Sequence, residues 1–253
     1  MTNKDKVYKL LKGIETGDAD AASVVNEGKY IQHNPHTREG SIGLAELFKQ
    51  LSKTGPKVQM IRVFEDKDFV FAHMLYDFSS IKVTFEVFRF EDGFAVEHWD
   101  NLQPIADPNP SGHTMLDGAT MMEDRHLTEP NRQLVQCYVN DVLINHRFKL
   151  LYDYLDETCF TQHNPAMSDD VDSIRETLTE NDAGEHPSIF YHKVHRILAE
   201  GNFVLAICEG EHYGKPSSIY DLYRLSGGKI VEHWDTITPI PPKSEWKNNN
   251  GKF

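Results

Sequence analysis

The chain has 253 residues, of which 39% are hydrophobic and 26% are charged, and its formal net charge is −13 at pH 7. This composition is typical of a globular protein with one large or two small cores and excludes extensive disorder. The negative charge would repel phosphate backbones, and no stripe of Lys and Arg interleaved with aromatic residues counteracts it. Nucleic acid is therefore not expected as a partner.

The sequence has no apolar segment typical of export and no cysteine spacing typical of a metal site. No stretch approaches the roughly 18 apolar residues that a membrane span needs, and the first residues lack the apolar core of a signal peptide. We therefore expect a cytoplasmic protein with no membrane partner. The cysteines are odd in number and lack paired zinc-ligand spacing, which favours free thiols at Cys137, Cys159 and Cys208.

Two motifs recur in the same order in the two halves of the chain. Gln-His-Asn-Pro at 32–35 returns at 162–165, an offset of 130 positions, and Glu-His-Trp-Asp at 97–100 returns at 232–235, an offset of 135. Such colinear repeats predict a tandem duplication with a five-residue insertion in the second copy. We expect a first domain at 1–105, a Pro- and Gly-rich linker at 106–125, a second domain at 126–240 and a loose tail at 241–253.

The first half begins with an amphipathic pattern and ends in a series of strand signals. Apolar residues at helical spacing before Gly17 predict a first helix, and a second helix is expected after the 32–35 motif, around residues 44–51. Segments rich in Val, Ile, Phe and Tyr predict strands at 57–66, 69–78, 81–90 and 94–103.

The second half repeats this scheme. A helix is expected from about Thr128, another near 171–178, and strands at 187–199, 202–212, 216–225 and 229–237. Helices followed by a meander of long strands describe an α+β fold. We predict two tandem cone-shaped domains, each with N-terminal helices packed in a curved, mostly antiparallel sheet.

The last hairpin of each half determines which side chains face the cone. Glu-Asp-Gly at 91–93 suits a three-residue loop, which would place Glu86 opposite His98. The same count in the second half pairs Leu225 with Lys229 and places Asp221 opposite His233. A two-residue loop would set Glu86 against Trp99 instead.

A carboxylate beside an imidazole fixes its tautomer and raises its basicity, which prepares it for general acid/base work. Residues two positions apart on a strand share a face, so an aspartate accompanies each histidine. The alternative is a structural role, in which the polar side chains of the two strands hydrogen-bond to each other near the mouth of the cone. The candidate catalytic residues are Glu86, His98, Asp100, Asp221, His233 and Asp235.

The candidate substrate-binding residues come mainly from the Gln-His-Asn-Pro motifs. Asn-Pro is also typical of a structural corner, so a purely structural role is the alternative. His73 has Ile207 as its counterpart, and it either tunes the first pocket or is an ordinary edge histidine. The candidates are His33, Asn34, His73, His163 and Asn164.

The opposite face of each hairpin carries an aromatic residue and an arginine. We expect Trp99 and Trp234 to pack at an interface, and Arg89 and Arg224 to pair with Glu97 and Glu232. The two halves are expected to form an intrachain pseudo-dimer, with a further homo-oligomer as a possibility. No metal-ligand spacing, nucleotide-binding loop or nucleophile elbow occurs, so neither a cofactor nor a metal is expected.

The segment from 220–224 through 228–235, its counterpart in the first half and both Gln-His-Asn-Pro motifs resemble SnoaL-like proteins of the nuclear transport factor 2 superfamily. Those proteins are predicted aldol-condensation-catalysing, polyketide cyclase-like enzymes. The resemblance implies the cone fold and a cofactor-free aspartate that helps to deprotonate carbon next to a carbonyl. Asp100 and Asp235 are the nearest matches to that aspartate.

Two functions follow as hypotheses. The first is a cofactor-independent lyase, cyclase or isomerase acting on a small carbonyl-containing molecule, with protonated His98 and His233 and the amides of Asn34 and Asn164 stabilising the enolate. The second is a non-catalytic protein that binds or senses a small molecule. A scaffold with filled cones is a third, weaker reading.

Overall fold

The computed structural model describes residues 1–179 and 187–253 and divides the chain into two compact units. Unit 1 comprises Met1–Pro104 together with Pro241–Phe253, and unit 2 comprises Ile105–Ile240. No helix within the described residues is long and apolar enough to cross a membrane.

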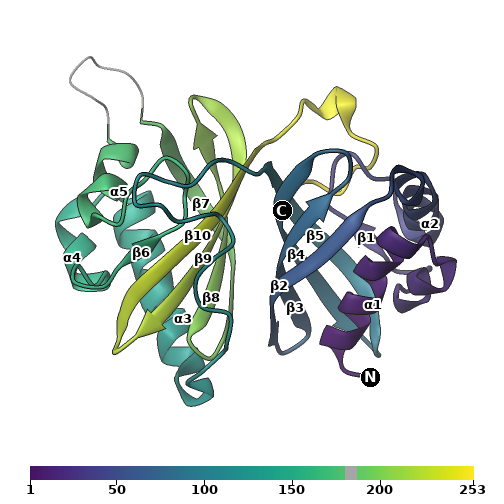
Figure 1. The fold of residues 1–253 in the computed structure, drawn as a ribbon, viewed down its shortest axis with the longest axis horizontal. Helices are drawn as coiled ribbons and strands as arrows, with labels where there is room; N and C mark the ends of the chain where they lie inside the picture. Colours follow the sequence, from purple (N-terminus) through teal and green to yellow (C-terminus); the bar gives the residue numbers. More distant parts are fainter. Residues whose placement is uncertain (180–186) are drawn as a thin grey trace. The chain divides into compact units, whose positions relative to one another are not determined.

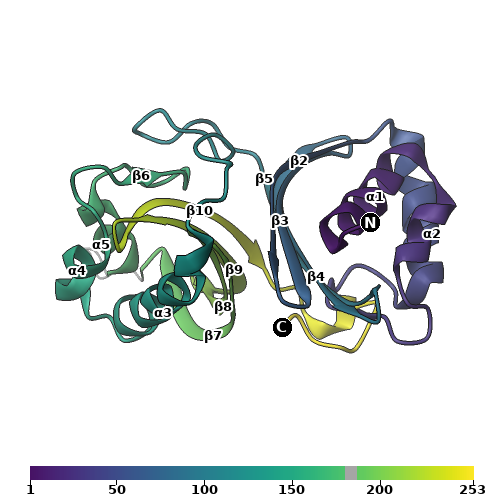
Figure 2. The same cartoon turned by 90° about the horizontal axis from the view of Figure 1, so that it is seen from below.

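Unit 1 is a curved sheet wrapped around helices, as the sequence predicts. Its strands pair in the order β1-β5-β4-β3-β2, and only the pair β1 and β5 is parallel. In Figure 2 the sheet curves around α1. The helical elements are α1 (Asn3–Thr16), a 3-10 turn (Ala19–Val24), α2 (Gly40–Leu51) and a second 3-10 turn (Ser52–Thr54). The strands are β1 (Ile31–Gln32), β2 (Lys57–Asp66), β3 (Phe69–Asp77), β4 (Ile81–Glu91) and β5 (Phe94–Pro104).

Local sequence explains where α1 begins and ends. The Thr2 hydroxyl accepts the backbone N–H of Asp5 while the Asp5 carboxylate accepts that of Thr2, which forms a capping box. Gly17 ends the helix with φ 71°, a left-handed conformation that glycine adopts at little cost. The apolar stripe of the helix is buried against the concave face of the sheet, through Val7, Leu10, Leu11 and Ile14.

Unit 2 has the same topology, with strand order β6-β10-β9-β8-β7 and a parallel pair β6 and β10 (Figure 1). Its helices are α3 (Thr128–Tyr138), which continues into a π-helical segment (Val139–Ile144), α4 (Leu151–Tyr154) and α5 (Val171–Leu178). Short 3-10 turns occur at Arg125–Leu127 and Phe148–Leu150. The strands are β6 (Thr161–Gln162), β7 (Ile189–Glu200), β8 (Phe203–His212), β9 (Lys215–Ser226) and β10 (Lys229–Pro239).

The hairpin between β4 and β5 differs from the predicted three-residue loop. Glu91 pairs with Phe94, and the two loop residues, Asp92 and Gly93, both have positive φ (51° and 81°), as a type I′ turn requires. A β-bulge follows, because Phe90 pairs with Ala95 but Arg89 pairs with Glu97. The extra residue restores the alternation that the shorter loop would have reversed.

The predicted cross-strand pairs are accordingly wrong by two residues, although the predicted faces are right. Glu86 pairs with Asp100, and His98 lies opposite Phe88. In unit 2, Ser226 rather than Leu225 pairs with Lys229, a bulge follows Ile230, and Asp221 pairs with Asp235 while His233 lies opposite Tyr223.

The segment that follows the last strand of each unit belongs to the other unit. Residues 241–253 follow β10 but belong to unit 1, and residues 105–124 follow β5 but belong to unit 2. The tail is not loose, because Asn250 Nδ2 donates to Gln32 O at 3.0 Å; in unit 2, Asn109 Nδ2 donates to Gln162 O at 2.7 Å. These segments satisfy backbone carbonyls of strands that are only two residues long.

Candidate functional site

The predicted catalytic residues of unit 1 meet on the face of the sheet that packs against the helices. His98 Nε2 lies 2.6 Å from Glu86 Oε2, and the Tyr76 hydroxyl donates to Glu86 Oε1 at 2.8 Å. Asn34 Nδ2 donates to Asp100 Oδ2 at 2.5 Å. All of these side chains are buried except Asn34, which is half-buried, so the cluster has little access to water.

Unit 2 repeats the arrangement with aspartate in place of glutamate. His233 Nε2 lies 3.1 Å from Asp221 Oδ1, which also accepts the Tyr191 hydroxyl at 3.0 Å. Asn164 Nδ2 donates to Asp235 Oδ2 at 2.5 Å. The duplication has therefore preserved a histidine, two acidic residues and an asparagine at matching positions.

A glutamine fixes the tautomer of each histidine. Gln32 Oε1 accepts the backbone N–H of Asn34, which identifies this atom as the amide oxygen, and His98 Nδ1 lies 2.8 Å from it. Gln162 Oε1 likewise accepts a backbone N–H from Asn164 and lies 2.9 Å from His233 Nδ1. An oxygen can only accept, so Nδ1 carries a proton in both rings. A hydrogen bond between Nε2 and the carboxylate therefore requires a second proton on one of these two atoms.

Burial changes the acidity of these clusters. Burial raises the pKa of Glu86, although the neighbouring His98 opposes this shift. Burial also raises the pKa of Asp235 to about 6, with a further contribution from the charge of Asp221. The pKa of Tyr191 lies well above its usual value because the ring is buried beside Asp221, so this phenol stays a hydrogen-bond donor.

The two clusters differ in the contacts of the aspartate on the last strand, which is Asp100 in unit 1 and Asp235 in unit 2. In unit 1, Lys252 of the tail is buried and its Nζ lies 2.5 Å from Asp100 O and 3.4 Å from Asp100 Oδ1. In unit 2, Asp235 Oδ1 is buried and hydrogen-bonds to none of the described residues. The backbone carbonyl of Gly251 lies beside Nδ1 of His33, and the backbone carbonyl of Thr114 lies beside Nδ1 of His163. The two carbonyls are therefore equivalent, and the residue after Thr114, Met115, is the counterpart of Lys252.

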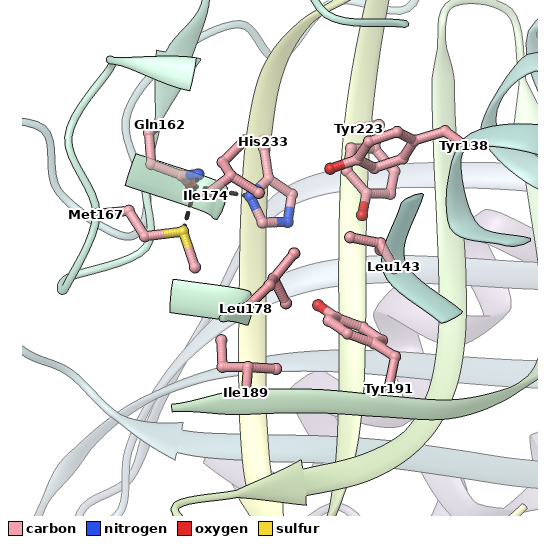
Figure 3. Close-up of a pocket in the computed structure, with 10 residues that line it drawn as sticks. All are labelled: Tyr138, Leu143, Gln162, Met167, Ile174, Leu178, Ile189, Tyr191, Tyr223 and His233. Carbon is pink, nitrogen blue, oxygen red and sulfur yellow. Dashed lines mark hydrogen bonds between the residues drawn. The ribbon is translucent and has the colours of Figure 1, made fainter. Parts of the chain in front are cut away.

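Two hollows lie beside the unit 2 cluster. His233 and three tyrosines turn their polar ends toward a small inner cavity (Figure 3). Its volume, counted as the space open to the centre of a water molecule, is about 20 Å³, which is room for about one water. Asn164 lines an outer hollow of about 290 Å³, and Ile189 lines both spaces.

The same side chains could also hold a metal ion. In each of the sets Glu86, His98, Asp100 and Asp221, His233, Asp235, one ligand atom per residue lies within 4.8 Å of the others. A histidine with two carboxylates is a donor set that several divalent metals accept.

The motif histidines lie on the other face of the sheet. His33 stacks on Trp99 with ring centroids 4.7 Å apart, and its Nε2 lies 3.0 Å from Glu97 Oε1. His163 does the same with Trp234 and Glu232. They do not join the histidine and carboxylate clusters; of the predicted binding residues, only Asn34 and Asn164 do.

His73 also lies away from the cluster. It pairs with Phe85 on the adjacent strand and stacks on its ring at 4.5 Å, while its neighbour Ala72 pairs with Glu86. Its Nδ1 lies 3.0 Å from Arg62 Nη1. The expected arginine pairs are confirmed on this outer face, with Arg89 Nε 2.7 Å from Glu97 Oε2 and its counterpart Arg224 bonded to Glu232.

Sequence reasoning did not single out several residues of the clusters. Gln32 and Gln162 carry a signal, because they open the repeated four-residue motif. The two tyrosines carry none, because Tyr76 lies on β3 and Tyr191 on β7, which are not equivalent strands. Lys252 belongs to a tail with no counterpart motif in the linker.

No protein-family model matches the chain, and no curated protein matches it. Among solved structures, the chain is similar to TsrD from Streptomyces laurentii (17% identity, 40% of this chain and 87% of that one, TM-score 0.36). It is also similar to IdmH, a putative polyketide cyclase from Streptomyces antibioticus (14% identity, 41% and 93%, TM-score 0.36). A third is an NTF2-like protein of unknown function from Cytophaga hutchinsonii (19% identity, 41% and 92%, TM-score 0.36). The second description names a putative polyketide cyclase and the third an NTF2-like protein, the class that the sequence motifs resemble.

Proposed function

We propose that unit 2 contains a cofactor-independent acid/base active site of the lyase, cyclase or isomerase type, which acts on a small carbonyl-containing molecule. The observation that carries this proposal is Asp235 Oδ1, a buried carboxylate oxygen that no described residue satisfies. A buried acceptor without a partner is costly, and active sites are where such costs are retained.

Asp235 has the properties of a general base. With a pKa of about 6 it is largely ionised near neutral pH, yet its proton affinity exceeds that of an ordinary aspartate. In the proposed step, Oδ1 takes a proton from the carbon beside the substrate carbonyl. The electrons of that C–H bond move into the enolate, and the proton of the resulting carboxylic acid returns to another substrate atom.

Asn164 and His233 would complete the site. Asn164 uses one N–H on Asp235 and also lines the outer hollow, so its amide can orient a substrate there and offer its second N–H to the enolate oxygen. His233, with Nδ1 held by Gln162, can pass the proton on Nε2 to and from Asp221. The hollow of about 290 Å³ would hold the body of a small organic molecule, and the reacting carbon must reach inward from it, because Asp235 does not line this hollow.

A test measures exchange of the α-protons of methyl acetoacetate in D2O by NMR, with the uncatalysed rate subtracted. We expect the protein to accelerate exchange and Asp235→Asn, which keeps the shape of the side chain, to lower the rate at least about a hundredfold. Asp100→Asn is the matched change in unit 1. The assignment to unit 2 fails if Asp100→Asn abolishes exchange while Asp235→Asn does not. Adding and removing Zn²⁺ with a chelator distinguishes this chemistry from a metal-dependent reaction, because the proposed rate does not depend on metal.

One observation favours the second candidate, a protein that binds a small molecule without reacting it. The inner cavity of about 20 Å³ cannot admit an organic molecule beside His233 as it stands. In that case a ligand occupies the outer hollow and Asn164 orients it. Saturable binding of methyl acetoacetate without any exchange above background would support this function.

A further inference from the structure

A separate groove on the surface of unit 2 is lined by the segment that precedes α4, by α4 and by α5. Figure 1 shows where these helices lie in unit 2. Its volume is about 780 Å³, within the usual range of small-molecule sites. None of its lining residues belongs to the acid/base cluster. The residues that matter here are His146, Arg147, Phe148, Lys149, Tyr152 and Arg175.

The groove is basic in a chain that is strongly acidic overall. Arg147 and Arg175 each form one ion pair, with Asp141 at 3.0 Å and Asp172 at 3.2 Å. Each guanidinium has five N–H donors, so both retain donors for another acceptor. Lys149 is exposed, and its ammonium forms no ion pair within the described part of the chain. Among the residues that line the groove, Arg147, Lys149 and Arg175 are cationic and Asp172 is the one acid, while Asp141 and Asp170 lie nearby.

The internal duplication shows that the fold does not require these residues. Val25 and Leu155 form equivalent isolated bridges to β5 and β10, which aligns the segments that precede them. In unit 1, Gly17 is followed by Asp-Ala-Asp-Ala-Ala at 18–22, whereas in unit 2 His146 is followed by Arg-Phe-Lys-Leu-Leu-Tyr at 147–152. Small and acidic residues in one copy have become basic and aromatic residues in the other.

His146 occupies a position for which glycine is the natural residue. Its φ is 55°; in unit 1 the residue with positive φ that ends α1 is Gly17 with φ 71°, eight positions before Val25, whereas His146 lies nine positions before Leu155. The imidazole packs on Phe190, with ring centroids 4.9 Å apart, and its Nε2 is buried without a hydrogen-bond partner among the described residues. Backbone strain and an unsatisfied nitrogen are both unfavourable, and such features cluster at functional sites.

We propose that this groove binds a small organic anion, whose carboxylate or phosphate group contacts Lys149 and Arg175 and whose apolar body packs on Phe148 and Tyr152. Oxyanions form charge-assisted hydrogen bonds with ammonium and guanidinium groups, and aromatic walls remove apolar surface from water. The imidazole of His146 supports the wall formed by Phe148, since their rings lie 5.5 Å apart.

Calorimetric titration of the full-length protein at low salt tests this site. The probes are phenylphosphate and phenylacetate, with benzyl alcohol as the neutral analogue and inorganic phosphate as the anion without an apolar body. We expect at least one aromatic anion to bind more tightly than both controls, and added salt to weaken it. Binding of only one of the two identifies the preferred oxyanion. Equal binding of benzyl alcohol, or of inorganic phosphate, overturns the proposal.

Two variants locate the binding. Lys149→Glu removes a charge-assisted contact and should weaken the aromatic anion by about tenfold to a hundredfold. The matched control is Lys193→Glu, the same charge change at an exposed position of β7 outside the groove. Equal effects of the two changes would show that only net charge matters and would refute the site.

His146→Gly separates function from folding. Glycine relaxes the positive φ, so the thermal midpoint should stay the same or rise while the anion binds more weakly. A stabilised variant with unchanged binding would contradict the role of His146. Because the readout is binding at this groove, Asp235→Asn should leave it intact, and the result is independent of the proposed reaction.

Discussion

Replacing Asp235 by Asn should make the stability of unit 2 less dependent on pH. Burial raises the pKa of Asp235 from 3.8 to about 6, so the folded protein favours the protonated acid. A shift of about two pH units corresponds to about 3 kcal/mol. The sign follows from the direction of the shift: this contribution is fully present below pH 4 and is lost as the pH rises through about 6. Asn cannot ionise and resembles the protonated acid.

The measurement is urea unfolding of the natural protein and of Asp235→Asn at intervals from pH 4 to 8. The natural protein should lose about 3 kcal/mol relative to the variant across this range. Titrating groups outside the cluster cancel in the difference, and any fixed cost of the new amide beside Asn164 does not depend on pH. If the two units unfold in separate steps, only one step should change. A difference that stays constant within about 0.5 kcal/mol would show that the pKa of Asp235 is not raised.

Two further changes test the contacts around the clusters. Lys252→Met removes the charged donor from Asp100 and should destabilise unit 1 by about 1–3 kcal/mol in denaturant unfolding, and an unchanged midpoint would mean that the tail does not hold this contact. Burial by itself would raise the pKa of Glu232, but hydrogen bonds from His163 and Arg224 lower it, so its contribution to stability is present above the unfolded pKa and is lost as the pH falls. Arg224→Met should therefore cost about 3 kcal/mol at pH 7 and less near pH 4, and equal losses at both pH values would contradict this account.

The elements of the fold could be predicted because each has a strong local cause. The apolar stripe before Gly17 predicts α1, and alternating strand patterns predict β2 to β5 within one residue at each end. The repeat then transfers every element of the first half to the second.

The hairpin register could not be predicted from the loop residues alone. Asp92 and Gly93 suit either a two- or a three-residue loop, and the bulge that follows has no clear sequence signature. The two errors offset each other, so the shared face of Glu86, His98 and Asp100 was predicted correctly while their partners were not. The face on which a side chain lies is easier to predict than its cross-strand partner. Only an odd total number of inserted residues moves the side chain to the other face.

Residues contributed by remote segments were beyond local reasoning. Tyr76 and Tyr191 reach equivalent carboxylates from different strands, so the repeat cannot reveal them. Lys252 is separated from Asp100 by 152 positions, and its burial depends on how the tail packs. Such contacts follow from tertiary structure and not from spacing along a strand.

Because the segments after β5 and β10 each belong to the other unit, one unit is continuous in sequence and the other is not. Unit 2 is one uninterrupted stretch, Ile105–Ile240, and a gene fragment can encode it directly. Unit 1 is discontinuous, so a fragment that ends at Pro104 lacks the residues that satisfy Gln32 O and Asp100 O. A peptide of residues 241–253 added in trans, or a circular permutation that joins it to Met1, would restore those bonds, and the boundaries suggested by the repeat are therefore not the boundaries at which the chain can be cut.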